Sequence, residues 1–343
     1  MESDYDELDR RLVHALQIDG RAPFSTVAAV LGASDRTVAR RYARLRASGA
    51  VRVLGGVDPV ALGAELWLLR VRCAPSAAVA VAEALARRPD TSWVSLTSGG
   101  TEITCTVRAE TEADSEALLL ARLPRTPRVE GVSAHSVLHT FYGGPDSLIA
   151  KIGPLAPAAV AALHPAAPAH RLPPDRLPPD RLPPDRLPPD RLPPGPVRLD
   201  DGDRRLLAAL GTDGRAGFEE LAAVTGWSPT TVRRRMTELR ERGVLYLDID
   251  CDPRLLGVGT RTLLWISVAP PYLEEAGRAL AGHPEVAFAC ATTGPTNLYA
   301  TVVCADQRAL YRYLTTRVAA LPAVTHVETA PSIKTVKQAA NRG

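Results

Sequence analysis

Arginine is concentrated in two stretches of the chain, at spacings suited to contact with nucleic acid. Residues 34–52 contain six Arg and one acidic residue, and residues 226–242 contain five Arg and two acidic residues. A guanidinium can hold a phosphate or bind guanine in a bidentate fashion. Because the formal net charge of the whole chain is only +3, this basic character is local.

Each stretch forms a two-faced helix when it is projected at about 100° per residue. Val38 and Leu45 fall on one side in the first stretch, as do Val232 and Leu239 in the second. The candidate DNA-contacting residues lie opposite these apolar positions or beside them: Arg36, Arg40, Arg41, Arg44, Thr230, Arg233, Arg234 and Arg235. A solvated charged face is the alternative interpretation.

Both basic helices are preceded by the elements that a helix-turn-helix domain requires. Leucines at spacing four predict a helix over 6–18, and an apolar segment predicts a shorter one over 24–31. Ser34 is suited to cap the third helix, 35–47, and Ser228 with the following proline gives the same start signal in the second stretch. The pattern favours a DNA-binding helix-turn-helix.

The chain is one unit written twice. Residues 9–49 match residues 203–243 at roughly 23 of 41 positions without a gap. The dipeptide Asp58-Pro59 recurs as Asp252-Pro253, and the segment 97–107 recurs as 292–302. Each copy therefore contains a helical domain followed by a second domain.

The second domain of each copy reads as strand, helix, strand, strand, helix, strand. The elements expected in the first copy are 66–73, 76–88, 91–98, 101–108, 112–123 and 129–141; those in the second are 262–269, 271–282, 285–292, 296–303, 306–320 and 324–336. This order is the ferredoxin-like split motif, so the fold class is α+β. The sheet face without helices is free to associate, and we expect the two sheets to pair, within the chain or between chains.

A proline-rich spacer separates the copies. Residues 171–195 read RLPPD four times and then RLPPG, which favours an extended polyproline II segment. A proline-motif ligand is the alternative interpretation. The predicted domains are a helix-turn-helix domain over 1–60, a sheet domain over 61–144, a linker over 145–196, a second helix-turn-helix domain over 197–256 and a second sheet domain over 257–343.

Other chemistries receive little support from the residues. The five cysteines are odd in number and include no C-x-x-C, which disfavours a zinc ribbon or a disulfide scaffold. His135 and His139 lie about 13 Å apart if they share a strand, too far to hold one metal ion. We expect no metal, no cofactor and no catalytic residues. With no secretory signal and no apolar run long enough for a membrane span, we expect a cytoplasmic protein without a membrane partner.

Short motifs in both copies together resemble the Lrp/AsnC (feast/famine) family of transcriptional regulators. These motifs are DGRA at 19–22 and 213–216, S-x-x-T-V-x-R-R at 34–41 and 228–235, and D-P-x-x-L-G at 58–63 and 252–257. The resemblance implies a regulator that binds double-stranded DNA. It also implies that the sheet domain, called the RAM domain in that family, dimerises and binds a small effector, usually an amino acid.

The resemblance further implies an effector-binding turn, which this sequence alters. The family's G-x-Tyr-Asp-Leu is matched by residues 99–103 and 294–298, where the acid becomes Glu102 and Asn297. The candidate effector-binding residues are Gly99, Thr101, Glu102, Gly294, Thr296 and Asn297. A carboxylate can bind a ligand ammonium and a neutral amide lacks that charge, so the first copy is the better site. Hairpin geometry alone is the alternative.

Two other functions remain open. Siroheme decarboxylases resemble the same two-domain architecture and act through His and Arg in the sheet domain, so an enzyme of that kind is the alternative to a regulator. An effector-binding partner protein without DNA contact is the other. The Arg-rich third helix, retained in both copies, favours the regulator.

Overall fold

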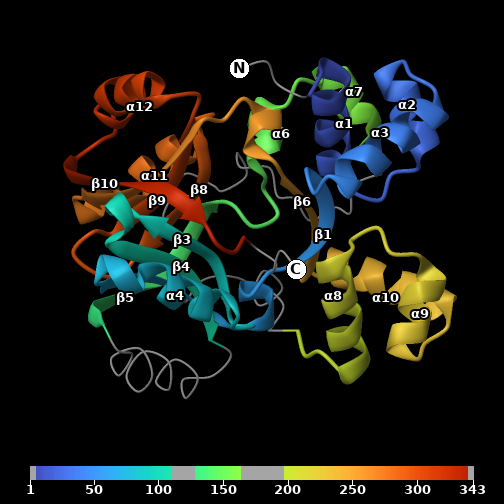
Figure 1. Cartoon of the computed structure of the whole chain (residues 1–343), viewed down its shortest axis with the longest axis horizontal. Coiled ribbons are helices and arrows are strands. Elements are labelled where there is room, and N and C mark those ends of the chain that lie inside the picture. Colours follow the sequence, from blue (N-terminus) through green and yellow to red (C-terminus); the bar gives the residue numbers. More distant parts are fainter. Residues whose placement is uncertain (1–4, 110–127, 164–196, 339–343) are drawn as a thin grey trace, which may run out of the picture.

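The computed structural model describes residues 5–109, 128–163 and 197–338. In Figure 1 the two groups of short helices lie on one side of the molecule with a ribbon of strands between them, and the remaining strands of both copies form one body on the other side. The helix expected over 112–123 and the RLPPD repeats of 171–195 lie outside the described residues.

Each helical domain, here called a head, consists of three helices as the sequence predicts. The first head contains α1 (Glu7–Ile18), α2 (Phe24–Leu31) and α3 (Asp35–Ala47), and the second contains α8 (Asp201–Thr212), α9 (Phe218–Thr225) and α10 (Pro229–Glu241). The first helix of each head begins with a capping box, formed by Asp6 with Asp9 and by Asp200 with Asp203. The boundaries expected for the helices of the first head are thereby confirmed to within a residue.

A two-stranded ribbon joins the two heads. Strand β1 (Val51–Val57) follows the first head, and β6 (Leu245–Cys251) follows the second. They pair antiparallel from Val51 opposite Cys251 to Val57 opposite Leu245. Local sequence patterns offer no sign of this pairing, because each strand has its partner in the other copy. The heads are therefore held together by main-chain hydrogen bonds between the copies.

The remaining strands of both copies form one closed barrel. They are β2 (Glu65–Cys73), β3 (Thr91–Thr97), β4 (Glu102–Ala109), β5 (Val129–Tyr142), β7 (Thr260–Val268), β8 (Val286–Thr292), β9 (Leu298–Cys304) and β10 (Val324–Thr335). The order around the barrel is β10-β3-β4-β2-β5-β8-β9-β7. The long strands close it: β5 pairs first with β2 and then with β8, and β10 pairs with β7 and with β3. The two sheets thus pair within the chain.

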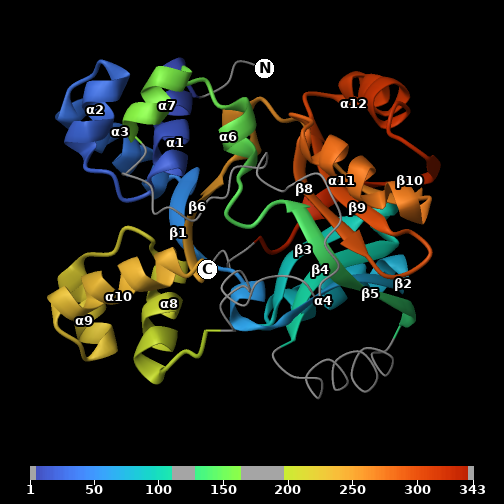
Figure 2. The same cartoon turned by 180° about the vertical axis from the view of Figure 1, so that it is seen from behind.

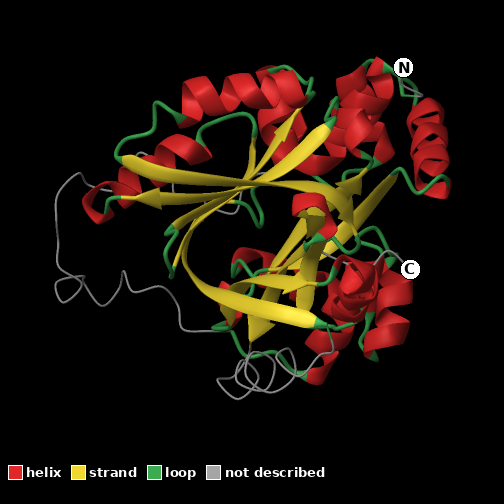
Figure 3. Ribbon diagram, turned by 60° about the vertical axis from the view of Figure 1, so that its left-hand side comes forward, coloured by secondary structure: helices red, strands yellow, loops and turns green. Residues whose placement is uncertain are grey.

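Helices cover the outside of the barrel, as Figure 3 shows. Helix α4 (Pro75–Ala86) packs on the first copy's sheet; α11 (Leu273–Ala281) and α12 (Gln307–Tyr313), which continues as a π-helical turn over Leu314–Val318, pack on the second. A third apolar cluster belongs to both sheets and consists of Leu68, Leu263, Trp265, Cys290, Tyr299 and Ala330. This shared core joins the copies as one body.

Two helices lie in the segment that the sequence assigns to the beginning of the linker. They are α6 (Leu148–Ile152) and α7 (Pro157–Leu163), which lie beside the first head in Figure 2. Ile149 and Leu163 are buried in the core of that head. Lys151 donates from Nζ to three main-chain carbonyls of the second sheet domain, at 2.6–3.1 Å. Residues 148–163 therefore connect the first head to the second copy's sheet.

The mixed α+β class and the tandem architecture are confirmed. In the part of the chain that the structure describes, none of the helices has the length and apolar character needed to cross a membrane.

Candidate nucleic-acid interface and sheet-domain site

The basic helices α3 and α10 are positioned by a serine cap and an apolar face. The Ser34 hydroxyl accepts the Thr37 amide at 3.1 Å, and the Ser228 hydroxyl accepts the Thr231 amide at 3.2 Å. The residues expected on the buried side, Val38, Tyr42, Leu45, Val232, Met236 and Leu239, are all buried. Because one face of each helix is fixed in the core, the opposite face is turned to solvent.

The solvent-facing positions carry most of the predicted DNA-contacting residues. Arg36 and Arg40 are exposed on α3, and Thr230, Arg233 and Arg234 are exposed on α10. The Arg234 side chain is 72% exposed and lies 3.9 Å from Glu238, a weak pairing at that distance. These side chains are free to contact a partner, which is the property that the predicted role requires.

Three of the predicted arginines instead hold α1 or α8 against the basic helix. Arg41 donates to Asp6 at 2.6 Å and to Asp9 at 2.9 Å, and Arg44 donates to Asp9 at 2.5 Å. In the second head, Nε and Nη2 of Arg235 donate to the two oxygens of the Asp203 carboxylate, each at 2.6 Å. The predicted phosphate contacts of Arg41 and Arg235 compete with these ion pairs.

The buried carboxylate of Asp203 depends on its arginine. Burial raises the pKa of Asp203, but the hydrogen bonds from Arg235 and from the Asp200 amide outweigh burial and hold that pKa below its ordinary value. The hydrogen bond to Asp203 raises the pKa of Arg235 in turn. Asp203 is fully buried, while the Arg235 side chain is 18% exposed. The Arg235–Asp203 pair therefore connects α10 to α8 inside the second head.

In the first copy, the predicted effector turn forms a polar site on the side of the sheet away from α4. Gly99 and Gly100 have positive φ, and the Thr101 hydroxyl donates to the Ser98 carbonyl at 2.8 Å. Glu102 is buried, and its carboxylate contacts the Arg70 guanidinium and accepts the Ser98 hydroxyl at 3.2 Å. The carboxylate predicted to hold a ligand ammonium is thus already paired with a cation.

The second copy contributes an acid to this site. Arg70, on β2, donates to Glu102 and also to Glu328 of β10, at 2.5 Å and 2.9 Å for the latter. Its guanidinium lies over the Trp265 ring, 4.8 Å from the centroid. Burial lowers the pKa of Arg70, yet the bonds to the two carboxylates raise it overall, and the bond to Arg70 lowers the pKa of Glu328.

This charged group lines a cavity of about 380 Å³. Its lining includes Arg70, Glu102 and Glu328, together with Arg72, Gly131, Val132 and Ser133. Arg72 is exposed on the same strand face as Arg70, two residues on. Sequence analysis missed Arg70, Arg72 and Glu328. Glu328 could not be found from spacing, because it lies 226 positions from Glu102 and comes near it through the pairing of β10 with β3 of the other copy.

In the matching turn of the second copy, the predicted effector-binding side chain is already bonded to main-chain groups. The Asn297 side chain accepts the Val268 amide and donates to the Val268 carbonyl, both at 2.9 Å. Thr296 is buried, and its carbonyl accepts the Thr292 hydroxyl. Gly294 has a φ of 110°, and a Cβ there would lie 2.5 Å from the His135 ring. At a shift of 195, Trp265 stands where the first copy has Arg70.

The histidines singled out by sequence analysis pack against neighbouring rings and backbone. His135 is bonded to the Thr293 carbonyl at 2.9 Å and stacks near Trp265, and His139 lies edge-on to Phe141. Within residues 5–109, 128–163 and 197–338 there is no group of three or more His, Cys, Asp or Glu suited to a metal ion.

Both heads and the second sheet domain match known protein domains. The AsnC-type helix-turn-helix domain matches residues 6–46 and 199–240, and the Lrp/AsnC ligand binding domain matches residues 262–341. The HTH-type transcriptional regulator FL11 of Pyrococcus horikoshii is 27% identical over 143 residues, 41% of this chain and 94% of that protein. The regulatory protein AsnC of Escherichia coli is 29% identical over 147 residues, 40% of this chain and 96% of that protein. These domains and relatives support a DNA-binding regulator. The chain belongs to the Lrp/AsnC family and carries its unit in two tandem copies.

Solved structures of a siroheme decarboxylase share the fold over almost the whole chain. The siroheme decarboxylase NirDL, in co-complex with an iron-uroporphyrin III analogue, aligns over 98% of this chain and 94% of its own with a TM-score of 0.60 and 17% sequence identity. At that identity the likeness concerns the fold.

Proposed function

We propose that this chain is a transcriptional regulator that binds a two-part DNA site as a single molecule. The observation that carries the proposal is the assembly of two heads in one chain: the β1–β6 ribbon and the closed barrel join the copies, while both basic helices keep a solvent-facing surface. A homodimer of a one-copy relative would need a second chain to present two such helices.

The two heads are proposed to read different half-sites. Arg36 and Arg40 in one head, and Thr230 and Arg234 in the other, are the side chains proposed to face base edges. Arg36 in α3 is matched by Thr230 in α10, and a guanidinium selects guanine where a threonine hydroxyl has no such preference. The preferred site is then an imperfect palindrome.

The sheet-domain cavity is proposed to bind the effector, an amino acid or a related metabolite. Two carboxylates, Glu102 and Glu328, and two guanidiniums, Arg70 and Arg72, line it. This set matches a zwitterion, whose ammonium would contact the carboxylates while its carboxylate contacts Arg72. The Asn297 turn is proposed to stay empty, because its amide is already bonded to Val268.

The test begins with selection of bound sequences from random DNA by the full chain. Fluorescence anisotropy with a selected site then compares the parent with Arg40→Ala and Arg234→Ala. The matched control is Arg278→Gln, an exposed arginine on α11 in the sheet domain. We expect both head variants to bind more weakly and the control to bind like the parent. A parent that selects no sequence would refute the regulator.

The same preparation tests the decarboxylase-like alternative. Fold similarity at 17% identity does not carry over what NirDL acts on. We expect an absorbance titration of the full chain with an iron porphyrin to show no saturable binding. Saturable binding in a chain that selects no DNA would instead favour the enzyme.

A further inference from the structure

The turns that precede α2 and α9 hold each other through a reciprocal pair of arginines. Arg21 donates from its two terminal nitrogens to the carbonyls of Gly214 and Ala216, both at 2.8 Å. Arg215 donates in the same way to the carbonyls of Gly20 and Ala22, at 2.6 Å and 3.1 Å. Each arginine thus closes the DGRA turn of the opposite copy, and these four bonds are called the clasp below.

The clasp is built from parts that repeat in both copies. The Asp19 carboxylate accepts the Arg21 amide at 3.0 Å, and the Asp213 carboxylate accepts the Arg215 amide at 2.9 Å, which fixes each turn. Gly214 lies against the β1–β6 ribbon, where a Cβ would come within 3.0 Å of the Leu54 backbone. Aspartate, glycine and arginine of the DGRA motif therefore each have a structural part in this contact.

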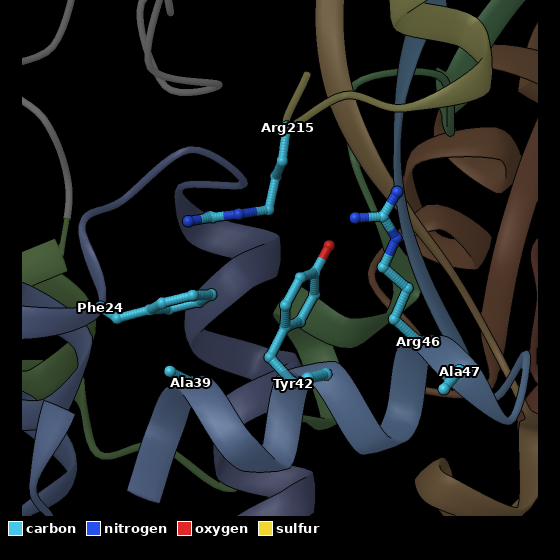
Figure 4. A pocket seen from close by; sticks show the side chains of 7 residues that line it. Phe24, Ala39, Tyr42, Arg46, Ala47 and Arg215 are labelled. Atoms are coloured by element: carbon cyan, nitrogen blue, oxygen red, sulfur yellow. The ribbon is translucent and has the colours of Figure 1, made fainter. Parts of the chain in front are cut away.

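Aromatic rings connect the clasp to the basic helices. The Arg215 guanidinium lies 4.6 Å from the Phe24 ring centre and 5.5 Å from that of Tyr42, and Figure 4 shows it beside both rings. Tyr42 belongs to α3. In the other head, Arg21 lies 4.8 Å from the Phe218 ring, and Arg233 of α10 lies 4.7 Å from the same ring. Each clasp arginine thus lies on an aromatic ring of the opposite head. That ring belongs to the basic helix of that head or is in contact with it.

The chemistry of these contacts requires arginine in particular. Burial lowers the pKa of both Arg21 and Arg215, and their bonded partners are main-chain carbonyls, which carry no charge to offset that burial. A planar guanidinium presents two N–H donors in a fixed fork that reaches two carbonyls of one turn while its face stacks on a ring, whereas a lysine ammonium is a compact donor without that fork. A further ion pair, Arg46 to Asp213 at 2.7 Å, joins α3 to the opposite turn.

We propose that the Arg21/Arg215 clasp locks the two heads at one separation and orientation, and so determines which spacing of DNA half-sites the chain accepts. The ribbon alone is a two-stranded element, which is marginally stable by itself and twists readily. The clasp adds a second point of attachment away from the strands. The half-site part of this inference rests on the proposed DNA-binding function, but the locking of the heads does not.

Distance measurements between spin labels test the locking without DNA. Ala29 on α2 and Ala223 on α9 are exposed and occupy equivalent places in the two heads, so both are changed to Cys in the full chain. Cys251→Ser removes the one native cysteine that is not buried. Pulsed electron resonance then gives the distribution of the distance between the labels. We expect one narrow distribution for the parent and for Arg278→Lys, the control outside the heads.

Arg21→Lys combined with Arg215→Lys keeps both charges and removes the paired bonds. We expect this variant to give a broad distribution while circular dichroism shows the parent's helix content. A distribution as narrow as the parent's, centred at the same distance, would overturn the proposal. If the double variant does not fold, the single variant Arg21→Lys, which leaves half of the clasp, is measured against the same criterion.

A spacing series tests the consequence for DNA. The selected half-sites are placed at centre-to-centre distances that vary in single base pairs around one helical turn of about 10 bp. Simultaneous engagement of linked sites can raise affinity by about 10²-fold or more, so we expect the parent to show one sharp optimum of at least that order. We expect the double variant to lose the optimum and keep its affinity for single half-sites. An optimum as sharp as the parent's would contradict the proposal. A parent that binds no DNA refutes the proposed function, and the label distances still decide whether the clasp locks the heads.

Discussion

We expect the replacement of Arg235 by alanine to destabilise the second head rather than to remove a contact with DNA. Asp203 is fully buried, and both of its oxygens are bonded to Arg235 at 2.6 Å. In Arg235→Ala, the Asp203 carboxylate keeps one hydrogen bond among the described residues, from the Asp200 amide at 3.1 Å. A buried charge is then left without its counter-charge.

The size of the effect follows from that remaining bond and from the exposure of Arg235. Removal of one partner of a buried ion pair costs about 3–5 kcal/mol. Because Asp203 keeps the Asp200 amide and the Arg235 side chain is 18% exposed, we expect the lower end, about 3 kcal/mol. At about 1.36 kcal/mol per factor of ten, the open population of the head rises by about 10²-fold.

Native-state hydrogen exchange measures this opening where it occurs. We expect the amides of α8 and α10 to lose about 10²-fold of protection, with the barrel strands unchanged. The matched control is the neighbouring Arg234→Ala, whose side chain is 72% exposed. We expect its stability to change by less than about 0.5 kcal/mol. The two adjacent arginines are thus expected to separate stability from recognition.

The effect should also depend on pH in a definite direction. The folded state holds the pKa of Asp203 below its ordinary value of 3.8, so the stability that this carboxylate contributes is present above that value and lost as the pH falls through the folded pKa. We expect the parent and Arg235→Ala to differ fully at neutral pH and to converge in strong acid. Unchanged protection of α8 and α10, combined with weaker binding to every DNA sequence, would refute this reasoning and assign Arg235 to phosphate.

Four further predictions follow from the other sites. Arg40→Ala and Arg234→Ala are each expected to weaken DNA binding by about 1–3 kcal/mol in anisotropy titrations, and wild-type affinity in the double variant would contradict the groove assignment. An amino-acid effector is expected to change DNA affinity by about 5–150-fold, and Glu102→Gln is expected to abolish this effect without changing DNA binding in the absence of the effector. Calorimetry with the twenty amino acids checks this, and loss of effector binding only on substitution of Asn297 would reverse the assignment. Light scattering of dilute protein is expected to give the mass of one chain in a complex that still occupies both half-sites, and purely tetrameric or larger masses would count against pairing within the chain. His14 of α1 accepts the Leu155 amide, between α6 and α7, at 3.0 Å, and burial lowers the pKa of His14 below its ordinary value of 6.5. The stability that this contact contributes is expected to be present above that pH and to fall below it, and His14→Asn, followed by denaturant unfolding at several pH values, is expected to remove this dependence.

Local sequence signals were sufficient for the heads. Leucine spacing, an apolar segment and a serine cap act within a few residues, and they predict α1, α2 and α3 to within one residue. The strands were also predicted because alternation and turn residues are local. The same reasoning missed α6 and α7, since Pro154 and Pro157 and a run of alanines read as linker, and only packing on the first head makes this segment helical.

Contacts between the copies were beyond prediction from local patterns. The pairing of β1 with β6, and of Arg70 with Glu328, joins residues about two hundred or more positions apart, and no period or spacing marks them. Projection of the basic helices separated buried from exposed faces correctly, but it could not show that Arg41 and Arg235 lie against acids of the preceding helix. Those acids, Asp9 and Asp203, belong to the capping boxes of α1 and α8, and their contacts with the basic helices depend on how the helices pack.

Fusion of the two copies explains why the sheet-domain site is one-sided. In a symmetric dimer, every substitution near the barrel's axis appears twice, so an acid added to β10 would appear on both sides. In this chain Glu328 faces Arg70, while its counterpart Ser133 lies in the same cavity and the counterpart of Arg70 is Trp265. The Arg70 guanidinium lies over the Trp265 ring, so the apolar core of the barrel contacts the charged group directly. The cavity thus combines Arg70 and Glu102 of the first copy with Glu328 of the second, while Trp265, the counterpart of Arg70, belongs to the apolar core.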